Sequence, residues 1–371
     1  MYKNLAGHAV AGFLRAALAF AFFPLALLGL PAHAAAPLKV CFVYVAPMAD
    51  TGWVHQHELA RQALQAALGD RVQTLYAENV AEGPDAERVI RDFARQGCGL
   101  IFTPSFGYME PTRKVAREFP QVKFESITGY KTAPNVAIAN ARYYEGRYLA
   151  GIAAARMSKT HIAGYVAGFP IPEVVQGINA FTLGMRSVDP KARVKVVWLD
   201  AWFDPPRERD AAMTLFDQGA DVIAFHTGSA AAIAAAQARG KLAIAYHSDM
   251  RKVAPDAQLL AVRHEWAAYD IARARAVLEG TWKSGQVWGG IREGMIQVDD
   301  FGPKVPQAVR DEVRERARDI AAGRLIPFKA GAVPVYDNMG QMRIAPGHAL
   351  GDAQILHMDW LVQGVQGRTD Q

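Results

Sequence analysis

The sequence predicts an α/β protein made of two doubly wound parallel-sheet lobes, joined by a hinge that the chain crosses more than once. From Lys39 onward, short apolar runs rich in β-forming residues alternate with amphipathic helical patterns, which is typical of a parallel sheet covered by helices on both faces. The same series repeats from Tyr144 onward, without any short solenoid-type period. Two similar lobes imply a cleft between them.

The first series predicts four strands and three helices. Each predicted helix carries apolar residues at helical spacing, as Val89, Ile90 and Phe93 do in the second of them. The strands are expected at 40–45, 73–77, 100–103 and 123–127, and the helices at 53–68, 85–96 and 111–119.

The second series follows the same order. Asp204 before Pro205 is a favourable helix start, and Ser229 is a candidate cap for a later helix. Strands are expected at 161–166, 193–198, 222–226 and 242–246, and helices at 144–157, 173–186, 205–218 and 230–239.

The rest of the chain sets the predicted lobe boundaries. A strand at 259–263 and a helix at 266–279 are expected to return to the first lobe, and a helix at 306–322, stopped by Gly323, belongs to the second. The first lobe is therefore predicted to contain residues 37–140 plus 250–290, and the second lobe residues 141–249 plus 291–371.

Residues 1–34 are predicted to be a signal peptide. Lys3 and Arg15 precede an apolar run that ends at the small-residue site Ala32-His33-Ala34, so we expect cleavage near Ala34 and a periplasmic mature protein. A membrane anchor is the rival interpretation, but the run contains Pro24 and is short for a membrane span. Cys41 follows Val40, which does not fit a lipoprotein signal, so no lipid anchor is expected.

Charge and cysteine content exclude some partners and leave one question open. The net charge of +5 comes from 41 basic and 36 acidic residues without a basic run, so no nucleic-acid partner is expected. Cys41 and Cys98 both begin predicted strands, and they form either one disulfide in an oxidising compartment or two buried thiols. A monomer is expected.

Aromatic residues gather in the loops that follow predicted strands. Ligands of open α/β sheets lie beyond the carboxyl ends of the strands, where this chain carries Trp53, Phe106, Tyr108, Trp202 and Phe203. Flat rings on two walls suit a flat ligand, because a base stacked on an aromatic ring gains about 1–3 kcal/mol. The alternative is that these rings belong to the core or the lobe interface.

Polar residues in the same loops are candidates for reading the edges of a ligand. They are Asp50, His226, Ser229, His247 and Asp249. Trp266 either stacks on the ligand or seals the hinge.

No enzyme or cofactor motif is present in the sequence. The ten histidines contain no His-Glu-x-x-His arrangement, and the Gly164–Phe169 segment lacks dinucleotide-binding spacing. Neither a Walker loop nor a Gly-x-Ser-x-Gly elbow occurs. We therefore expect no catalytic residue, no metal and no cofactor.

Several segments resemble the basic membrane protein family, the purine-nucleoside-binding solute receptors of ABC importers, whose fold is the type I periplasmic binding protein fold. The resemblance covers essentially the whole mature chain. Its carriers are Asp50–Trp53, Ser105-Phe-Gly-Tyr108, Asn135–Ala137 running into Tyr144–Gly151, and Asp217–Ile223. A branch of the family is marked by Gly52-Trp53, Phe169-Pro-Ile-Pro-Glu173, Trp202-Phe-Asp-Pro205, His226-Thr227 and Met358-Asp-Trp360, and adenine is the ligand that this branch suggests.

The resemblance implies particular site residues. An acidic residue in the first loop and rings that sandwich the base fall on Asp50, Trp53 and Phe106 or Tyr108. His247 stands where nucleoside-binding members carry an aspartate, which weakens the case for ribose recognition, and Gly228 replaces a polar side chain of the closer branch. Glu173 either contacts the ligand or is stabilised at a helix start.

The implied function is that of a substrate-binding protein that closes its two lobes around a purine base or nucleoside and delivers it to an ABC permease. A receptor for a sugar or another small solute is one alternative, and a nucleoside-processing enzyme is another.

Overall fold

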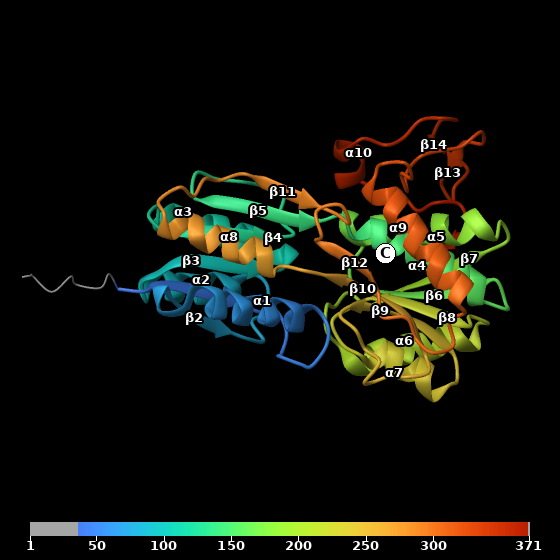
Figure 1. Ribbon diagram of the computed structural model, residues 1–371, viewed down its shortest axis with the longest axis horizontal. Helices are drawn as coiled ribbons and strands as arrows, with labels where there is room; N and C mark the ends of the chain where they lie inside the picture. Colours follow the sequence, from blue (N-terminus) through green and yellow to red (C-terminus); the bar gives the residue numbers. More distant parts are fainter. Residues whose placement is uncertain (1–35, 370–371) are drawn as a thin grey trace, which may run out of the picture. The chain divides into compact units, whose positions relative to one another are not determined.

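The computed structural model describes residues 36–369, which form two lobes with one central sheet each (Figure 1). Lobe 1 is built on the sheet of order β11-β5-β4-β3-β1-β2, and lobe 2 on the sheet of order β12-β10-β9-β8-β6-β7-β15. The predicted signal peptide lies outside the described residues. Within 36–369, no helix has the length and apolar character needed to cross a membrane.

Lobe 1 has an entirely parallel sheet. The central strand β1 (Leu38–Val43) pairs with β2 (Val72–Ala77) on one side and β3 (Cys98–Pro104) on the other, and its side chains from Val40 to Val43 are fully buried. The sheet continues through β4 (Lys123–Ile127), β5 (Val136–Ala141) and β11 (Gln286–Gly289). Burial on both faces explains the continuous apolar run of β1.

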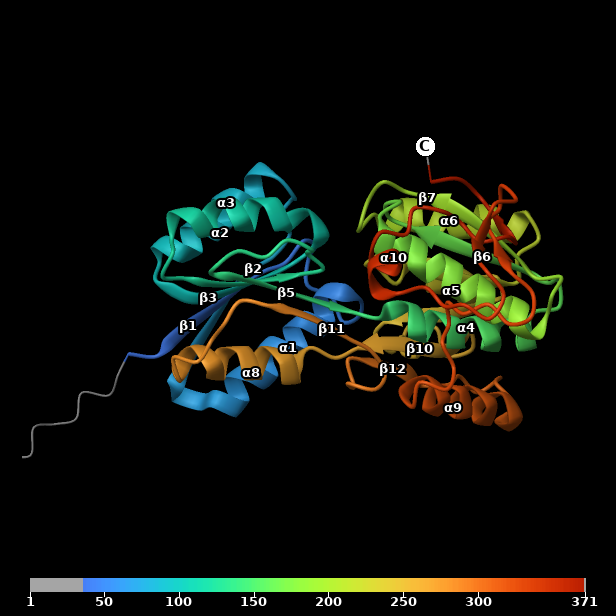
Figure 2. The ribbon, with the colours of Figure 1, turned by 90° about the horizontal axis from the view of Figure 1, so that it is seen from above.

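Helices cover both faces of the lobe 1 sheet (Figure 2). On one face lie α2 (Pro84–Arg95) and α3 (Met109–Glu118), and on the other lie α1 (Trp53–Leu68) and α8 (Ala267–Leu278). In α2, Ile90 and Phe93 are buried as the helical spacing predicted, together with Ala86 and Ala94, and Val89 is half-buried.

Lobe 2 repeats the arrangement with one antiparallel edge. The parallel strands are β6 (Ile162–Ala167), β7 (Arg193–Trp198), β8 (Val222–His226), β9 (Leu242–His247), β10 (Gln258–His264) and β15 (Val365–Gln366). The edge strand β12 (Ile296–Asp299) runs antiparallel to β10. In Figure 1, α4 (Tyr143–Met157) and α5 (Pro172–Val188) lie on one side of this sheet, and α6 (Pro205–Asp217) and α7 (Ala231–Ala238) on the other.

The cap expected at the start of α6 is present. Asp204 is the N-cap, its side chain accepts a hydrogen bond from the backbone N–H of Arg207 at 3.1 Å, and Pro205 follows in the first turn. A proline is tolerated there because the first helical N–H groups have no partner inside the helix.

The chain crosses between the two sheets three times within residues 36–369. It enters lobe 2 after β5, returns to lobe 1 between β10 and α8, and enters lobe 2 again between β11 and β12. These segments are the multi-crossover hinge.

One lobe assignment from the sequence needs correction. The strand predicted at 259–263 was expected in the first lobe, but β10 pairs with β9 and β12 in lobe 2. The crossover therefore comes one element later than predicted, after His264. Side chains of β10 are buried on both faces of the sheet, so its apolar pattern fits either lobe and carries no information about which sheet it joins.

The two cysteines form a disulfide. Cys41 of β1 and Cys98 of β3 lie on neighbouring strands with their Cα atoms 6.1 Å apart, and they bridge 57 positions of sequence. The interpretation as two buried thiols is therefore set aside. The bridge lies inside the lobe 1 core with Val43, Phe93 and Phe124.

The C-terminal part of the chain packs on lobe 2. It contains α9 (Gln307–Ala321), a small antiparallel pair of β13 (Val335–Tyr336) and β14 (Met342–Ile344), and α10 (Asp352–Leu356). The Asn179 amide of α5 holds the end of this segment, because it donates to the Trp360 carbonyl at 2.7 Å and accepts from the Val362 N–H at 2.8 Å.

Candidate ligand-binding pocket

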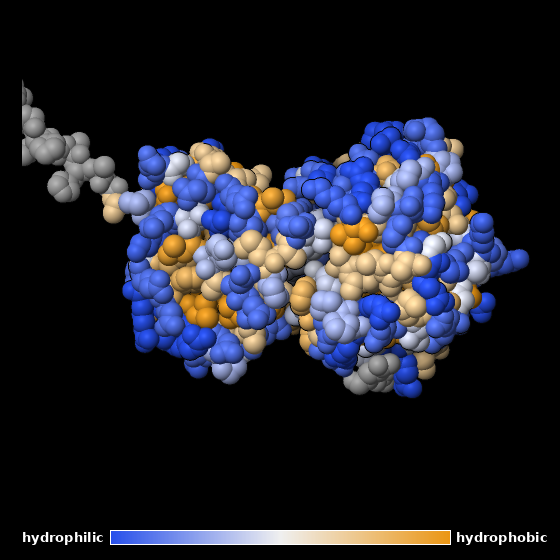
Figure 3. All heavy atoms as spheres, turned by 90° about the horizontal axis from the view of Figure 1, so that it is seen from below, coloured by the Kyte–Doolittle hydropathy of each residue, from blue (hydrophilic) through white to orange (hydrophobic). Residues whose placement is uncertain are grey.

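A pocket lies where the two lobes meet, at the carboxyl ends of strands from both sheets. It contains about 600 Å³ of space not filled by protein atoms, its open mouth included. The surface is hollowed where the lobes meet (Figure 3). The lining residues are Val45, Ala46, Pro47, Thr51, Trp53, Val54, Ser105, Phe106 and Thr128 from lobe 1, and Ile171, Glu173, Trp202, His226, Thr227, Gly228 and His247 from lobe 2.

The lobe 1 wall is mainly apolar and aromatic. Trp53 is the first residue of α1, and its indole Nε1–H donates to the Pro104 carbonyl at 2.8 Å. The bond fixes the ring at the end of β3. Phe106 lies in the short 3-10 helix Phe106–Tyr108 that follows β3. Trp53 and Phe106 therefore come from neighbouring strand ends.

The lobe 2 wall carries the titratable side chains. His226 and His247 are the last residues of β8 and β9, and Glu173 lies in the first turn of α5. The ring centroids of His226 and His247 lie 5.9 Å apart. Trp202 lies beside His226, with 6.2 Å between ring centroids.

Two residues of the pocket adopt left-handed backbone. Thr128 follows β4 with φ of 65°, and His247 ends β9 with φ of 69°. Such conformations are uncommon outside glycine and are costly for a β-branched residue such as threonine. Backbone strain of this kind is concentrated at binding and catalytic sites.

The pocket histidines are neutral. Burial lowers the pKa of His226 and of His247 well below the usual range, and the nearby Arg147 cation lowers both further. His247 is also close to the buried rings of His264, His226 and His57, which act in the same direction. Neutral imidazoles offer one donor and one acceptor nitrogen each.

Glu173 is the acidic residue of the pocket lining. Burial raises its pKa to about 7, and a hydrogen bond from Asn140 opposes that shift in part. Its Oε1 lies 3.5 Å from His226 Nε2, while its buried Oε2 has no hydrogen-bond partner among the described residues. An unpartnered buried carboxylate oxygen is costly unless a ligand or water bonds to it.

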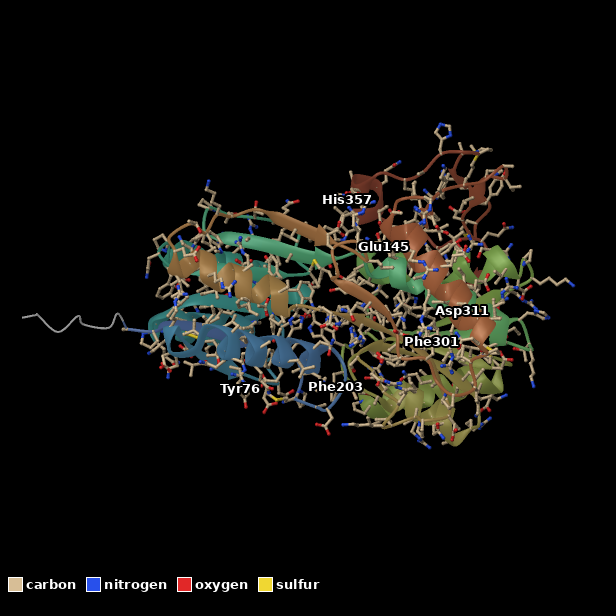
Figure 4. All side chains as sticks on the ribbon, viewed as in Figure 1. Tyr76, Glu145, Phe203, Phe301, Asp311 and His357 are labelled. Carbon is tan, nitrogen blue, oxygen red and sulfur yellow. A yellow bond between two sulfur atoms is a disulfide. The ribbon has the colours of Figure 1, made fainter. Side chains whose placement is uncertain are left out.

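The two lobes contact each other at the rim of the pocket. Trp202 Nε1–H of lobe 2 donates to Glu82 Oε1 of lobe 1 at 3.2 Å, and Gly52 N–H of lobe 1 donates to Ser248 Oγ of lobe 2 at 2.9 Å. Gly52, at φ of 92°, also faces the Gly228 carbonyl, and a Cβ atom on Gly52 would lie 2.2 Å from that oxygen. Phe203 lies nearby, at the junction of the loop before α1 with lobe 2 (Figure 4).

Five of the ten residues predicted as ligand contacts line this pocket. They are Trp53, Phe106, Trp202, His226 and His247. All five follow or end strands, as the strand-end argument required.

The other five lie outside the pocket lining, each for a local reason. Asp50 is exposed next to the lining residue Thr51. Tyr108 is buried in the lobe 1 core, where its hydroxyl donates to the Val80 carbonyl at 2.5 Å. Ser229 Oγ donates to Glu208 Oε2 at 2.6 Å and accepts from Ala231 N–H at 3.1 Å near the start of α7.

Asp249 and Trp266 also have protein partners. The Asp249 carboxylate accepts from Arg251 Nη2 at 2.7 Å and from Gln258 Nε2 at 2.9 Å. Trp266 is buried in the crossover between β10 and α8, and its indole N–H donates to His264 Nδ1 at 2.7 Å. It lies behind the pocket and does not line it.

Sequence reasoning did not propose Thr128 or Glu82. Thr128 directly follows the predicted strand 123–127, so applying the strand-end argument to every strand would have found it. Glu82 lies in the turn before α2, and its contact with Trp202 spans 120 positions of sequence, which no local pattern indicates.

A second, larger cavity adjoins the pocket and shares Phe106, Thr128 and Glu173 with it. Its remaining lining is Gly129, Tyr130, Ile138, Asn140, Pro172, Gln176, Gln286, Val287, Trp288, Leu356 and His357. His357 comes from the C-terminal segment at the end of α10 (Figure 4). Within residues 36–369, no group of three His, Cys, Asp or Glu side chains is placed to hold a metal ion.

The comparisons with known proteins agree with this architecture. Residues 38–329 match the family of PnrA-like ABC transporter substrate-binding proteins. A purine-binding protein of Brucella abortus is 51% identical over 345 residues, which cover 93% of this chain and 97% of that protein. A protein of Haloferax volcanii named as an ABC transporter glucose-binding protein is 40% identical over 276 residues, 74% of this chain and 70% of its own length.

Solved structures show the same fold. An ABC transporter solute-binding protein of Conexibacter woesei superimposes with a TM-score of 0.64 at 21% identity, covering 78% of this chain and 98% of that one. A solute-binding protein of Aeropyrum pernix gives 0.67 at 20% identity, covering 78% and 93%. The fold prediction is confirmed, and the chain belongs to the family of PnrA-like ABC transporter substrate-binding proteins.

Proposed function

We propose that this protein binds a purine, of the adenine type, in the pocket between its lobes. The observation that carries the proposal is the composition of the two walls. Trp53 and Phe106 on lobe 1 and Trp202 on lobe 2 offer ring faces, and His247 and Glu173 offer hydrogen-bonding groups. A purine has two flat faces for stacking and a polar edge that needs partners. The 51% identity to the purine-binding protein of Brucella abortus supports the same ligand class.

A free base fits the lining better than a nucleoside. Ribose hydroxyls require acceptors as well as donors, and Glu173 is the carboxylate among the lining residues. By the family resemblance, His247, a neutral imidazole, falls at the position expected to be an aspartate in nucleoside-binding members. We therefore favour adenine over adenosine.

The family delivers small molecules to ABC permeases, and we propose the same role here. Residues 1–34 would direct export, and the mature chain would act as a periplasmic monomer that presents its ligand to an inner-membrane permease. No catalytic step is required, and bound nucleoside should be recovered intact from the protein.

A sugar is the second candidate ligand. The relative of Haloferax volcanii carries the name of a glucose-binding protein. The cavity that adjoins the pocket combines amide side chains, Asn140, Gln176 and Gln286, with the aromatic Trp288. Amides and aromatic faces together suit a polyhydroxylated ring.

A thermal-shift and calorimetry screen separates these ligands. The mature chain, refolded from denaturant to remove any carried-over ligand, is tested with adenine, adenosine, hypoxanthine and glucose. A ligand that binds only the native state raises the melting temperature. A shift with adenine and none with glucose supports the proposal, whereas a shift with glucose alone overturns the purine assignment.

A further inference from the structure

A chain of three buried side chains connects the hinge to the pocket. Trp266 lies in the crossover between β10 and α8, His264 is the last residue of β10, and His247 is the last residue of β9 and lines the pocket. Trp266 Nε1 lies 2.7 Å from His264 Nδ1, and His264 Nε2 lies 2.8 Å from His247 Nδ1. All three side chains are at most 3% exposed, so water does not replace these partners.

The first contact fixes the proton of His264. An indole Nε1–H can only donate, so His264 Nδ1 must be an acceptor without a proton. A doubly protonated His264 would place two donors against each other at 2.7 Å. His264 is therefore neutral and carries its proton on Nε2.

The second contact determines the tautomer of His247. Because His264 Nε2 carries the proton, it donates across the 2.8 Å contact, and His247 Nδ1 accepts. An imidazole with an unprotonated Nδ1 carries its proton on Nε2. Both of its nitrogens are then assigned, with Nδ1 engaged by the protein and Nε2–H left for a ligand.

The surroundings of these two hydrogen bonds keep the rings of His264 and His247 neutral. Burial is the main cause that lowers the pKa of His264, to about 3, and that of His247 well below its usual range. His226, His57 and the Arg147 cation lie near these rings and oppose an imidazolium. The titratable rings of Tyr246 and Tyr143 also pack against them, with centroids 3.9 Å from His247 and 5.7 Å from His264. Trp53 closes one side of the two histidine rings, with ring centroids 4.9 Å from His264 and 5.4 Å from His247.

We propose that the Trp266–His264–His247 relay makes His247 a fixed hydrogen-bond donor in the pocket, so that the protein selects ligands with an acceptor at that position. The acceptor is an unprotonated ring nitrogen or a carbonyl oxygen. That the ligand's acceptor is a ring nitrogen rests on the proposed purine function, whereas the tautomer of His247 does not depend on that function. Trp266 is thus a positioning residue that acts through His264 and does not touch the ligand.

The relay gives the pocket a complementary pair of polar groups. His247 donates, while the unpartnered Glu173 Oε2, when ionised, accepts. A heterocycle with both an unprotonated ring nitrogen and an amino group, such as adenine, can satisfy both groups. A ligand whose only polar atoms are donors leaves the His247 N–H unpaired, which is unfavourable in a buried site.

The direct test is the tautomer of His247 in the ligand-free protein. The probe is ¹⁵N NMR of the histidine-labelled mature chain at neutral pH, with signals assigned through the His247→Gln and His264→Gln variants. We expect a protonated Nε2 and an unprotonated Nδ1 for both His247 and His264. An Nδ1–H tautomer or an imidazolium at His247 overturns the proposal, whether or not the protein binds purines.

The Trp266→Phe variant tests the origin of the tautomer. It keeps a buried aromatic ring and removes the N–H, so His264 loses the donor that fixes Nδ1, and both histidines should show mixed tautomers. Trp198→Phe is the matched control, because Trp198 also donates its indole N–H, to the Arg368 carbonyl at 2.7 Å, away from the pocket. Unchanged tautomers in Trp266→Phe would show that the relay does not set them.

Deaza analogues provide the binding readout. The wild type should bind one of 1-, 3- and 7-deazaadenine roughly tenfold or more weakly than adenine, because that analogue lacks the acceptor for His247. This ratio should shrink in Trp266→Phe and disappear in His247→Phe, and remain in Trp198→Phe. Equal affinities for adenine and all three analogues in the wild type would overturn the ligand contact.

Discussion

Both walls of the pocket are built where strands of a central sheet end, one sheet in each lobe, yet the two walls carry different side chains. Lobe 1 contributes Trp53 and Phe106 in a mainly apolar surface, whereas lobe 2 contributes His226, His247 and Glu173. Lobe 1 thus offers surface to stack on, and lobe 2 offers groups that read a polar edge. Lobe 2 adds one further ring face, that of Trp202, so a ligand stacked on lobe 1 gains both a second ring and its hydrogen bonds from lobe 2.

This division explains why ligand binding and lobe closure belong together in the proposed function. A ligand held against lobe 1 by stacking has unpaired polar atoms until lobe 2 reaches it, so the closed arrangement is favoured by what the ligand gains there. Substitutions at the rim contacts therefore show how much lobe closure contributes to ligand affinity.

The largest effect is expected where the walls touch, at Gly52. An alanine there has to adopt a backbone at φ of 92° and places its Cβ 2.2 Å from the Gly228 carbonyl oxygen. The strained backbone costs about 1–3 kcal/mol, and overpacking adds about 1–3 kcal/mol in the closed form. Gly52→Ala should therefore lose most of its ligand affinity in calorimetry.

Gly83→Ala is the matched control for Gly52→Ala. Gly83 precedes α2 as Gly52 precedes α1, its φ is 89°, and a Cβ there meets nothing within 4 Å. Both variants should lose stability in urea unfolding through the strained backbone, and only Gly52→Ala should lose affinity. Equal affinities in the two variants would mean that the lobes bind ligand without the Gly52–Gly228 contact.

The next largest effect concerns Glu173 of the lobe 2 wall and the dependence of the free energy of unfolding on pH. The pKa of Glu173 is raised from 4.5 to about 7, so between these values the folded protein binds more protons at this site than the unfolded chain. The free energy of unfolding therefore falls as pH rises through this window, by roughly 3 kcal/mol for the shift. Glu173→Gln should show a smaller loss of stability between pH 5 and pH 8 than the wild type, measured by urea unfolding.

Glu125 of lobe 1 provides the contrast for Glu173. Its buried carboxylate accepts from Tyr269 Oη and Arg273 Nε at 2.5 Å and from Trp282 Nε1 at 2.6 Å. Removing its charge leaves the partly buried Arg273 without its carboxylate partner, so Glu125→Gln should be destabilised at pH 8, where Glu173→Gln is not. Similar behaviour of the two variants would argue against a special role for the unpartnered oxygen of Glu173.

Trp53 tests the stacking wall. Trp53→Ala should weaken purine binding by about 1–3 kcal/mol, because the face on which a base stacks is removed. Calorimetry gives the affinity, and the far-UV spectrum should remain that of the wild type. Unchanged affinity with an intact spectrum would remove Trp53 from the proposed site.

The sequence predicted most of the fold because both sheets are buried and, apart from the edge strand β12, parallel. The strands and helices that were predicted, from 40–45 to 306–322, lie within a few residues of their observed bounds, since each apolar run or helical face is local. The edge strands β11 and β12, four residues each, and the Ala-rich β5 were not predicted as strands, because their patterns are short and only weakly β-forming. Which lobe β10 joins is decided by its pairing with β9 and β12, and its own sequence does not indicate this.

The site was predictable to the extent that it consists of strand ends. Trp53, Trp202, His226 and His247 follow or end strands and line the pocket as expected. Tyr108, two residues after Phe106 in the same short helix, points into the core instead, because neighbouring residues in a 3-10 turn face different directions. The partners of Trp202 and His264 come from distant segments and have no local pattern.

The smallest effect is expected at the hydrogen bond that joins the walls through Trp202. Trp202→Phe keeps a ring in the pocket and removes the N–H that reaches Glu82 Oε1 at 3.2 Å. This oxygen keeps two other donors, Ser105 Oγ at 2.5 Å and Gly107 N at 2.9 Å, so no acceptor is left unpaired. Affinity for adenine should fall by only about 0.5–1.5 kcal/mol, the net value of one such bond.

Glu82→Ala, which removes the accepting carboxylate and is measured beside Trp202→Phe, shows whether that bond acts across the walls. If the contact contributes to closure, the double variant should lose less affinity than the two single losses added together, because both changes remove the same bond. Additive losses would show that Trp202 and Glu82 act independently. The stacking face of Trp202 would then be its whole contribution to the pocket.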